Sequence, residues 1–331
     1  MRLRAHLLAT TGGIVLMSAA AGAQAPACAA SQSRYEAWWT GPMLANSAAT
    51  LPRGHILLEP YFYDVAVRSS YDHNRVRHNV APSHGYGSLT YAIYGLTDDI
   101  GIGLIPVVGF NTVSGGPNSS RVGVGDIGML AQYRLVRARP CRWMPDISVA
   151  IQETFPTGKY DNLGARASDG LGGGAYFTTV SLYSQKSVSL RNGHTFRTRF
   201  NVSQSFSRAV NVEGVSVYGT GADFRGRAEP GRSASIDASL EYSVRRSVAL
   251  ALDVTYRGAH NTHVAGYGSS DLLGTQNIAF NSGPSEAVGL APAIEYSWTS
   301  NVGVLLGARF IPAGRNTSAS ITPAVAINFV R

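Results

Sequence analysis

The stretch Val248-Ala249-Leu250-Ala251-Leu252-Asp253-Val254-Thr255-Tyr256 alternates between large apolar residues and small or polar ones. Successive side chains of a β-strand point to opposite faces, so one face of this segment is apolar and the other carries Ala, Asp and Thr. The alternation recurs in five further segments, at 196–206, 236–244, 287–298, 302–310 and 319–329. A sustained period of two predicts strands rather than helices.

The length of these segments and the chemistry of their second face indicate a membrane protein. They run about 10 to 14 residues, whereas a soluble strand has about 5 to 6 and a tilted strand needs about 9 to 11 to cross a bilayer. Gly, Ala, Ser and Thr with single charges dominate the second face, which suits a barrel lumen. A soluble sandwich also alternates, but both properties favour an all-β, antiparallel transmembrane barrel.

We expect about twelve strands, and connections that alternate between short and long. The predicted strands are 54–67, 86–96, 99–110, 123–137, 145–156, 173–185, 194–207, 232–245, 247–258, 285–298, 300–311 and 317–330. The expected long loops are 68–85, 111–122, 157–172, 208–231 and 259–284, and the short connection 312–316 is an exception. Bacterial barrels have short periplasmic turns and long external loops, so both chain ends are expected in the periplasm.

The N-terminus predicts export. Residues 1–23 combine a basic start, an apolar run and a small-residue stretch, typical of a cleaved signal peptide; the alternative is a membrane anchor. Residues 24–53 form a periplasmic segment that either plugs or caps the barrel 54–331, or is a loosely docked leader. Cys28 and Cys141 suit an oxidising periplasm and are candidates for one disulfide.

Composition narrows the partners. Only 15% of residues are charged, and the net charge of +8 is the excess of 28 Lys and Arg over 20 Asp and Glu. Only two of the basic residues, Lys159 and Lys186, are lysines. The arginines are scattered rather than clustered on one face, so a nucleic-acid partner is not expected. We expect outer-membrane lipid, a small-molecule solute and the barrel assembly machinery as partners, in a bacterial outer membrane.

The candidate functional residues are charges on the lumen face. The alternation predicts that nine charged side chains point inward, namely those of Arg134, Arg197, Arg199, Asp126, Asp237, Glu241, Asp253, Glu295 and Arg309. If the segments 194–207 and 232–245 pair, Arg199 falls near Glu241. Buried charges must pair or line water, so these residues form either a constriction that selects solutes or a charge ladder that fills the interior.

Four motifs resemble a known family. They are Tyr94-Gly95-Leu96-Thr97-Asp98 running on to Pro106, Gly123-Val124-Gly125-Asp126 running on to Tyr133-Arg134, Phe155-Pro156-Thr157-Gly158, and Leu51-Pro52-Arg53-Gly54-His55 followed by Glu59-Pro60-Tyr61. In order and spacing they resemble the transporter-like outer-membrane family named for the MetA pathway of phenol degradation. The resemblance implies passage or binding of small, often hydrophobic molecules. Such barrels commonly end on an aromatic residue read by the assembly machinery, whereas here Val330 and Arg331 follow Phe329.

Patterns of catalytic and metal sites were also sought. None of the eight histidines is spaced to place its ring beside a serine hydroxyl with an orienting partner, so an enzyme is not expected. His73, His78 and His84 with Asp72 fit a polar external loop better than a metal site, and no glycine cluster precedes a phosphate-binding helix. We therefore expect no metal or cofactor. Three functions stay open: a channel for small, hydrophobic or aromatic molecules, a non-conducting structural or binding barrel, and a lipid-modifying enzyme.

Overall fold

The computed structural model describes residues 37–139, 143–270 and 274–331. Regular structure in this part of the chain is β-sheet, apart from one short 3-10 helix, η1 (Ala167–Asp169). No helix among these residues has the length and apolar content needed to cross a membrane. The predicted signal peptide, Cys28 and Cys141 lie outside the described residues.

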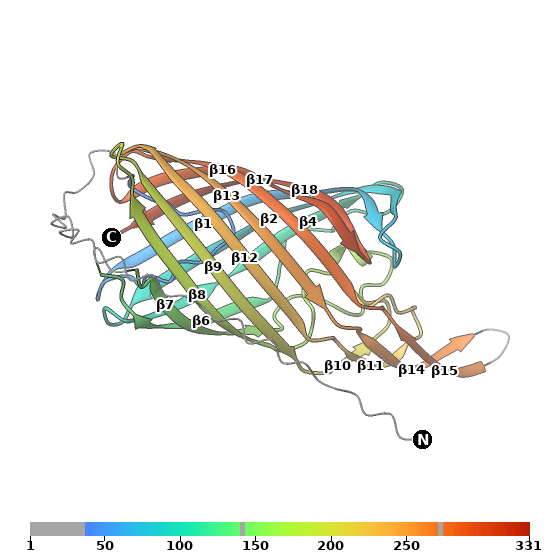
Figure 1. Cartoon of the computed structure of the whole chain (residues 1–331). Coiled ribbons are helices and arrows are strands. Elements are labelled where there is room, and N and C mark those ends of the chain that lie inside the picture. The colour runs from blue at the N-terminus through green and yellow to red at the C-terminus, as the bar shows by residue number, and fades with distance from the viewer. Residues whose placement is uncertain (1–36, 140–142, 271–273) are drawn as a thin grey trace, which may run out of the picture. The chain divides into compact units, whose positions relative to one another are not determined.

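The main sheet is a closed antiparallel barrel (Figure 1). It comprises β1 (Ile56–Tyr71), β2 (Arg77–Gly95), β3 (Ile100–Ile105), β4 (Val107–Val113), β5 (Gly123–Val124), β6 (Ile127–Val136), β7 (Asp146–Phe155), β8 (Phe177–Ser189), β9 (Thr195–Ser207), β12 (Ser233–Arg245), β13 (Val248–Ala259), β16 (Ser285–Ser297), β17 (Val302–Arg315) and β18 (Thr317–Val330). The barrel closes because β1 pairs with both β2 and β18.

Two strands of the wall are interrupted. β3 gives way to β4 at Pro106, which lacks the N–H needed to continue the ladder. β5 gives way to β6 at Gly125 and Asp126. Since β2 pairs with both β3 and β4, the fourteen strands make twelve passes through the wall. The predicted twelve-stranded antiparallel barrel is confirmed.

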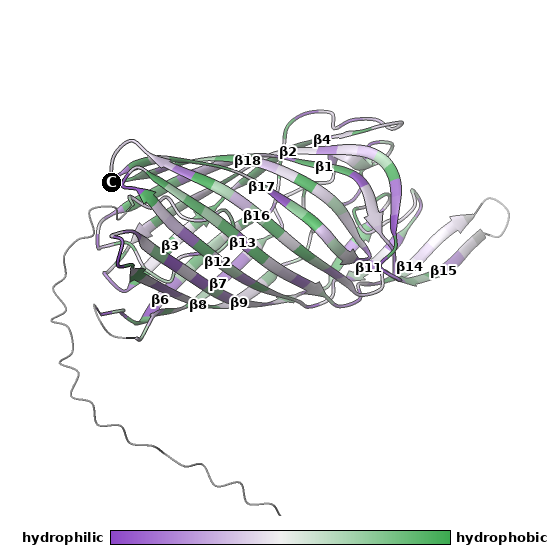
Figure 2. Ribbon diagram, turned by 45° about the horizontal axis from the view of Figure 1, so that its top comes forward, coloured by the Kyte–Doolittle hydropathy of each residue, from purple (hydrophilic) through white to green (hydrophobic). Residues whose placement is uncertain are grey.

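The apolar face of the alternating strands points outward. In β13, Leu250 and Tyr256 are 47% and 42% exposed, whereas Ala249 and Asp253 are 1% and 0% exposed. Figure 2 shows hydrophobic residues recurring along the barrel strands. An uncovered apolar wall faces hydrocarbon, and closure satisfies the backbone groups that an open sheet edge would expose. The protein is therefore an outer-membrane barrel, as the sequence predicted.

The two ends of the barrel differ. Short turns join β2 to β3, β12 to β13 and β16 to β17 at the end where the chain terminates with Arg331 (Figure 1). The opposite end carries a second, four-stranded sheet made of β10 (Val210–Glu213), β11 (Arg225–Glu229), β14 (His263–Ser270) and β15 (Gly274–Asn281). Because short turns are periplasmic in this class, we call the two ends the turn side and the loop side, the latter external.

Four predicted connections were wrong in detail. Most of 68–85 is strand, because β1 extends to Tyr71 and β2 begins at Arg77. The loops 208–231 and 259–284 contain the small sheet, whose core includes Val212, Phe224 and Val264. The exceptional connection 312–316 disappears, since β17 runs to Arg315 and turns at Asn316, which adopts a positive φ of 45°.

Candidate functional site

Residues 37–53, which precede β1, run inside the barrel, and we call them the plug. Ala45 and Ala48 are 3% and 0% exposed. The plug begins against the turn side, where the Trp38 N–H donates to the Arg246 carbonyl at 2.7 Å. It ends there too, where the Arg53 N–H donates to the Asp98 carboxylate at 2.9 Å. Both ends of the plug are thus tied to periplasmic turns.

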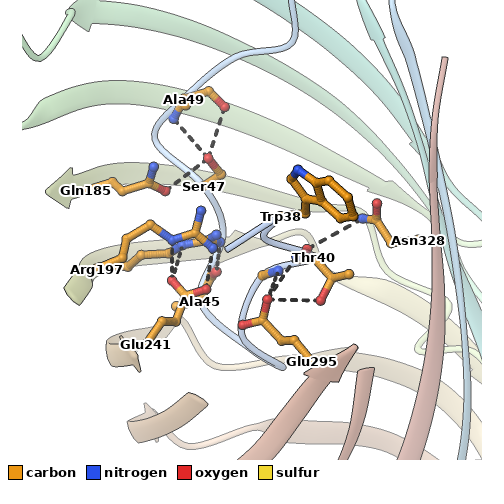
Figure 3. Close-up of polar contacts among 12 residues, drawn as sticks. Trp38, Thr40, Ala45, Ser47, Ala49, Gln185, Arg197, Glu241, Glu295 and Asn328 are labelled. Atoms are coloured by element: carbon orange, nitrogen blue, oxygen red, sulfur yellow. Dashed lines mark hydrogen bonds and ion pairs between the residues drawn. The ribbon is translucent and has the colours of Figure 1, made fainter. Parts of the chain in front are cut away.

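Two wall carboxylates hold the plug by its backbone, and Figure 3 shows the contacts of one of them, Glu295. The N–H groups of Thr40 and Gly41 donate to Oε2 of Glu295 at 2.8 and 3.0 Å, and the Thr40 hydroxyl donates to the same oxygen at 3.0 Å. One strand away, Asp253 accepts from the N–H groups of Leu44 and Ala45, both at 3.2 Å. The carboxylates supply acceptors that plug residues outside a sheet would otherwise lack.

The carbonyl groups of the plug also find partners on the wall. The side chains of Arg199, Asn201, Gln132 and Arg134 donate to the carbonyls of residues 45, 46, 47 and 50 at 2.7, 3.0, 3.0 and 2.8 Å. Each of these wall residues projects inward from its strand. The polar lumen residues of β6, β9, β13 and β16 therefore act together as a cradle for one specific chain segment.

A buried ion-pair cluster supports this cradle. Glu241 is 0% exposed and accepts hydrogen bonds from Nε and Nη2 of Arg197, while Nε of Arg199 lies 3.3 Å from its Oε2. The guanidinium of Arg197 also stacks 4.3 Å from the ring centre of Trp39, at the start of the plug. Removing one partner from such a cluster leaves an uncompensated buried charge, so it is rigid.

The other predicted lumen residues lie elsewhere. Arg134 is close to Asp146, at 3.8 Å, as well as to the plug. Asp126 holds a loop, because its two carboxylate oxygens accept from the N–H groups of Gly158 and Gly173 at 2.9 and 2.7 Å. Asp237 and Arg309 lie nearer the loop side, and among the described residues neither forms an ion pair with Glu241, although Arg309 lines a cavity together with Met43 and Leu44 of the plug.

Two kinds of lining residue were missed by the sequence reasoning. Glu59 is 8% exposed and accepts from the Asn328 side chain at 3.2 Å. Tyr61 and Tyr91 face the lumen with ring centres 6.0 Å apart. Both inward and outward faces of β1 are largely apolar, so the alternation there gave no clear signal. Only the register of β1 with β2 and β18 identifies the inward side.

The lumen has one polar and one apolar wall. An apolar cavity of about 230 Å³ lies between the plug and the inward residues of β1 and β2; it is lined by Tyr61, Tyr63, Leu89 and Tyr91 together with Met43 and Leu44 of the plug. Next to it, and sharing Val65 and Arg309 with it, a polar cavity of about 550 Å³ is lined mainly by serines and threonines of β9, β12, β13 and β18. A third cavity, of about 280 Å³, reaches the turn side around the plug.

The loops are ordered by local polar contacts. Asp169 accepts from the N–H of Ser120 at 2.7 Å, and this bond holds the pKa of the Asp169 carboxyl below its usual value. Burial raises the pKa of Tyr218 to about 12. Among the residues that the structure describes, no group of three or more His, Cys, Asp and Glu side chains could hold a metal ion.

Comparison with known proteins gives the fold. No protein-family model and no curated protein matches the sequence. The structure is similar to the COG4313 outer membrane channel from Pseudomonas putida F1, with a TM-score of 0.65 and 15% identity, covering 87% of this chain and 100% of that chain. It shares the fold of an outer-membrane channel.

Two further solved structures are more distant. The match to a NanC porin covers 98% of the porin chain and 83% of this chain, with 11% sequence identity and a TM-score of 0.40. The match to the Pseudomonas putida toluene transporter TodX covers 90% of the TodX chain and 84% of this chain, with 13% sequence identity and a TM-score of 0.41.

Proposed function

We propose that the protein is an outer-membrane channel for small molecules with a hydrophobic or aromatic body, and not an enzyme. The observation that carries the proposal is the apolar wall of the lumen. Porins for hydrophilic solutes have polar interiors, whereas binding sites for apolar molecules are concave and lined by apolar and aromatic side chains. Tyr61, Tyr63, Leu89 and Tyr91 supply such a lining inside a closed barrel.

A continuous route along this wall needs little rearrangement. The 230 Å³ cavity and the turn-side cavity of about 280 Å³ are both lined by Met43, Leu44, Tyr61 and Tyr91. Among the described residues, these four line both cavities and so form the boundary between them. Met is flexible, and side-chain rotation is fast compared with transport, so rotation of these side chains would join the cavities while the plug backbone stays bound.

We further propose membership of the transporter-like family named for the MetA pathway of phenol degradation. Two of the motifs quoted above contact each other, which supports reading them as one unit: the Thr157 hydroxyl donates to the Gly125 carbonyl at 2.8 Å, and the Gly158 N–H donates to Asp126. A third motif meets the plug, since the Thr50 hydroxyl donates to the Asp98 carbonyl at 2.7 Å.

The proposal includes the cellular context. Residues 1–23 would direct export and be removed, the barrel assembly machinery would insert the chain, and lipid would surround the outward face. Arg208 and Arg232 support the last point, because their guanidinium groups lie 5.8 and 5.7 Å from the ring centres of the outward-facing Tyr176 and Phe206. Aromatic and cationic side chains of this kind mark membrane interfaces.

Uptake by intact cells tests the channel function. A Gram-negative host producing the protein should take up radiolabelled benzyl alcohol faster than the same host without it. The variant Leu89→Glu, which places a charge on the apolar wall, should abolish this gain, whereas Ser235→Glu on the polar wall should keep most of it. Equal uptake with and without the protein, or equal uptake by both variants at equal outer-membrane levels, would exclude the proposal.

The second candidate is a non-conducting structural or binding barrel. The many wall contacts of the plug favour it, because they hold the lumen occupied. Single-channel recording in planar bilayers separates the two: a barrel that never conducts ions and never speeds aromatic uptake is structural.

A further inference from the structure

Two cavities of opposite character meet at one arginine. Arg309 projects inward from β17 and lines both the apolar cavity of about 230 Å³ and the polar cavity of about 550 Å³. Val65 of β1 lies at the same junction. A molecule with its apolar part in the first cavity would therefore present its other end to the Arg309 guanidinium.

Arg309 differs from Arg134, Arg197 and Arg199 in having no close partner. Arg134, Arg197 and Arg199 each donate to the plug or to a carboxylate. In contrast, within the described part of the chain no hydrogen bond from the Arg309 side chain and no ion pair includes this residue, and its Nε is buried without a partner, as are those of Arg134 and Arg199. A half-buried cation is costly unless an anion or water compensates it, so this guanidinium is suited to receive an anionic group.

The local charge is positive. Arg257 of β13 lines the same polar cavity and forms no ion pair with a described residue either. Asp237 of β12 interacts electrostatically with both Arg257 and Arg309, but from beyond ion-pair distance, and its Oδ1 has no hydrogen-bond partner. Glu286 also lines the polar cavity but is ion-paired with Arg75, so Arg257 and Arg309 against Asp237 leave one positive charge where the cavities meet.

The apolar cavity has room for one aromatic ring. A cavity of about 150 Å³ lined by apolar side chains is enough to bind benzene. The cavity here is larger, about 230 Å³, and its wall includes the rings of Tyr61, Tyr63 and Tyr91. Aromatic rings pack favourably on such side chains in offset or edge-to-face arrangements.

We propose that this junction is a binding site for small aromatic carboxylates: the ring lies against Tyr61, Tyr63 and Tyr91, and the carboxylate binds Arg309, with Arg257 nearby. A guanidinium can bind a carboxylate through two parallel hydrogen bonds, which gives strength and orientation. The serines and threonines around the polar cavity would solvate the free carboxylate before it binds. The inference rests on the proposed channel function and names a class of solute for it.

Equilibrium binding by the purified full-length protein in detergent tests the site directly. Radiolabelled benzoate should bind to the wild-type protein at least about tenfold more tightly than benzyl alcohol or methyl benzoate, which keep the ring but lack the charge. Arg309→Gln should remove that preference without changing the affinity for benzyl alcohol, and Arg309→Lys should keep part of it. Arg227→Gln, on the exposed small sheet, is the matched control and should bind benzoate as the wild-type protein does.

The outcomes are distinct. Equal binding of benzoate and methyl benzoate by the wild-type protein overturns the inference and needs no variant to fold. Unchanged benzoate affinity in a folded Arg309→Gln protein overturns it as well. If benzyl alcohol uptake in cells depends on the protein while benzoate shows no preference, the channel proposal stands and the carboxylate site fails. If benzoate binds at Arg309 but no aromatic uptake occurs, the site stands and the channel function fails.

Discussion

Replacing Glu295 with alanine should loosen the plug without dismantling the barrel. The carboxylate accepts three hydrogen bonds from Thr40 and Gly41, and no other described residue offers an acceptor to these groups. The neighbouring carboxylate of Asp253 still accepts hydrogen bonds from Leu44 and Ala45, the next part of the plug. The variant therefore removes one of the two carboxylates that hold the plug, and the closed sheet that surrounds the plug keeps its own ladder.

The size of the effect follows from these bonds. Each hydrogen bond contributes about 0.5–1.5 kcal/mol net, so three contribute about 1.5–4.5 kcal/mol to plug binding. Burial of the carboxylate opposes this, since removing the group also removes its desolvation cost. We therefore expect the fraction of molecules with an undocked plug to rise roughly 10- to 100-fold, at about 1.4 kcal/mol per factor of ten.

Thiol labelling measures that fraction. Ala48 is 0% exposed in the docked plug, so Ala48→Cys, with Cys28 and Cys141 replaced by serine, reacts only when the plug undocks. The labelling rate by a water-soluble maleimide should rise roughly 10- to 100-fold in Glu295→Ala. It should stay unchanged in the control Glu229→Ala, whose side chain is 60% exposed on the small sheet. A rate within twofold of the parent, or an equal rise in the control, would refute the role assigned to Glu295.

Three further predictions concern stability and titration. Glu241→Ala removes the ion-pair partner of two buried guanidiniums and should lower the free energy of unfolding by about 3–5 kcal/mol, measured from urea unfolding; an unchanged midpoint would contradict this. A Cβ on Gly95 would lie 2.2 Å from the Pro52 carbonyl oxygen, so Gly95→Ala should destabilise the protein by about 1–3 kcal/mol. Gly101→Ala, whose nearest neighbour is 3.8 Å away, should fold as the parent does in the same unfolding assay. Hydrogen bonding to His78 and to backbone N–H groups lowers the pKa of Asp72, which lies in the external hairpin between β1 and β2. This turn is therefore fully stabilised at pH values above the usual carboxyl pKa, and it loses that stability as the pH falls through the lowered pKa. His78→Ala should raise the pKa of Asp72, as measured by an NMR titration.

The barrel could be predicted because its physical cause repeats along the chain. Each of the later strands keeps apolar residues on one face for ten or more positions, and such a pattern has one solution in a membrane. The external part of β2, by contrast, has no sustained apolar face, because His78 and His84 share a face with Val80 and Pro82. It is a strand because β1 pairs with it across the turn that follows Tyr71, and pairing is not visible in local composition. The small sheet was missed for the same reason.

The lumen residues could be predicted as a set but not as individual roles. Alternation gives the face on which Glu295 and Asp253 lie, yet their partners are backbone N–H groups 208 to 255 positions away in the sequence. A backbone donor has no signature in the residue type of Thr40 or Leu44. Arg309 shows the opposite case, since its distinguishing property is a missing partner. Only the packed structure distinguishes a charge that anchors the plug from one that is free to bind a solute.

The position of the plug explains why the two walls of the lumen differ. A segment without regular secondary structure must have its N–H and C=O groups satisfied by side chains when it is buried, and the charged and amide residues of β6, β9, β13 and β16 do this. The plug therefore lies along the polar wall, and its apolar side chains Met43 and Leu44 turn toward Tyr61 and Tyr91. The space that stays open is then bordered by apolar groups from both the plug and the wall. A solute that needs many hydrogen bonds would lose them in this space, whereas an aromatic ring would lose none, so the same contacts that occupy the polar lumen leave a route that favours apolar molecules.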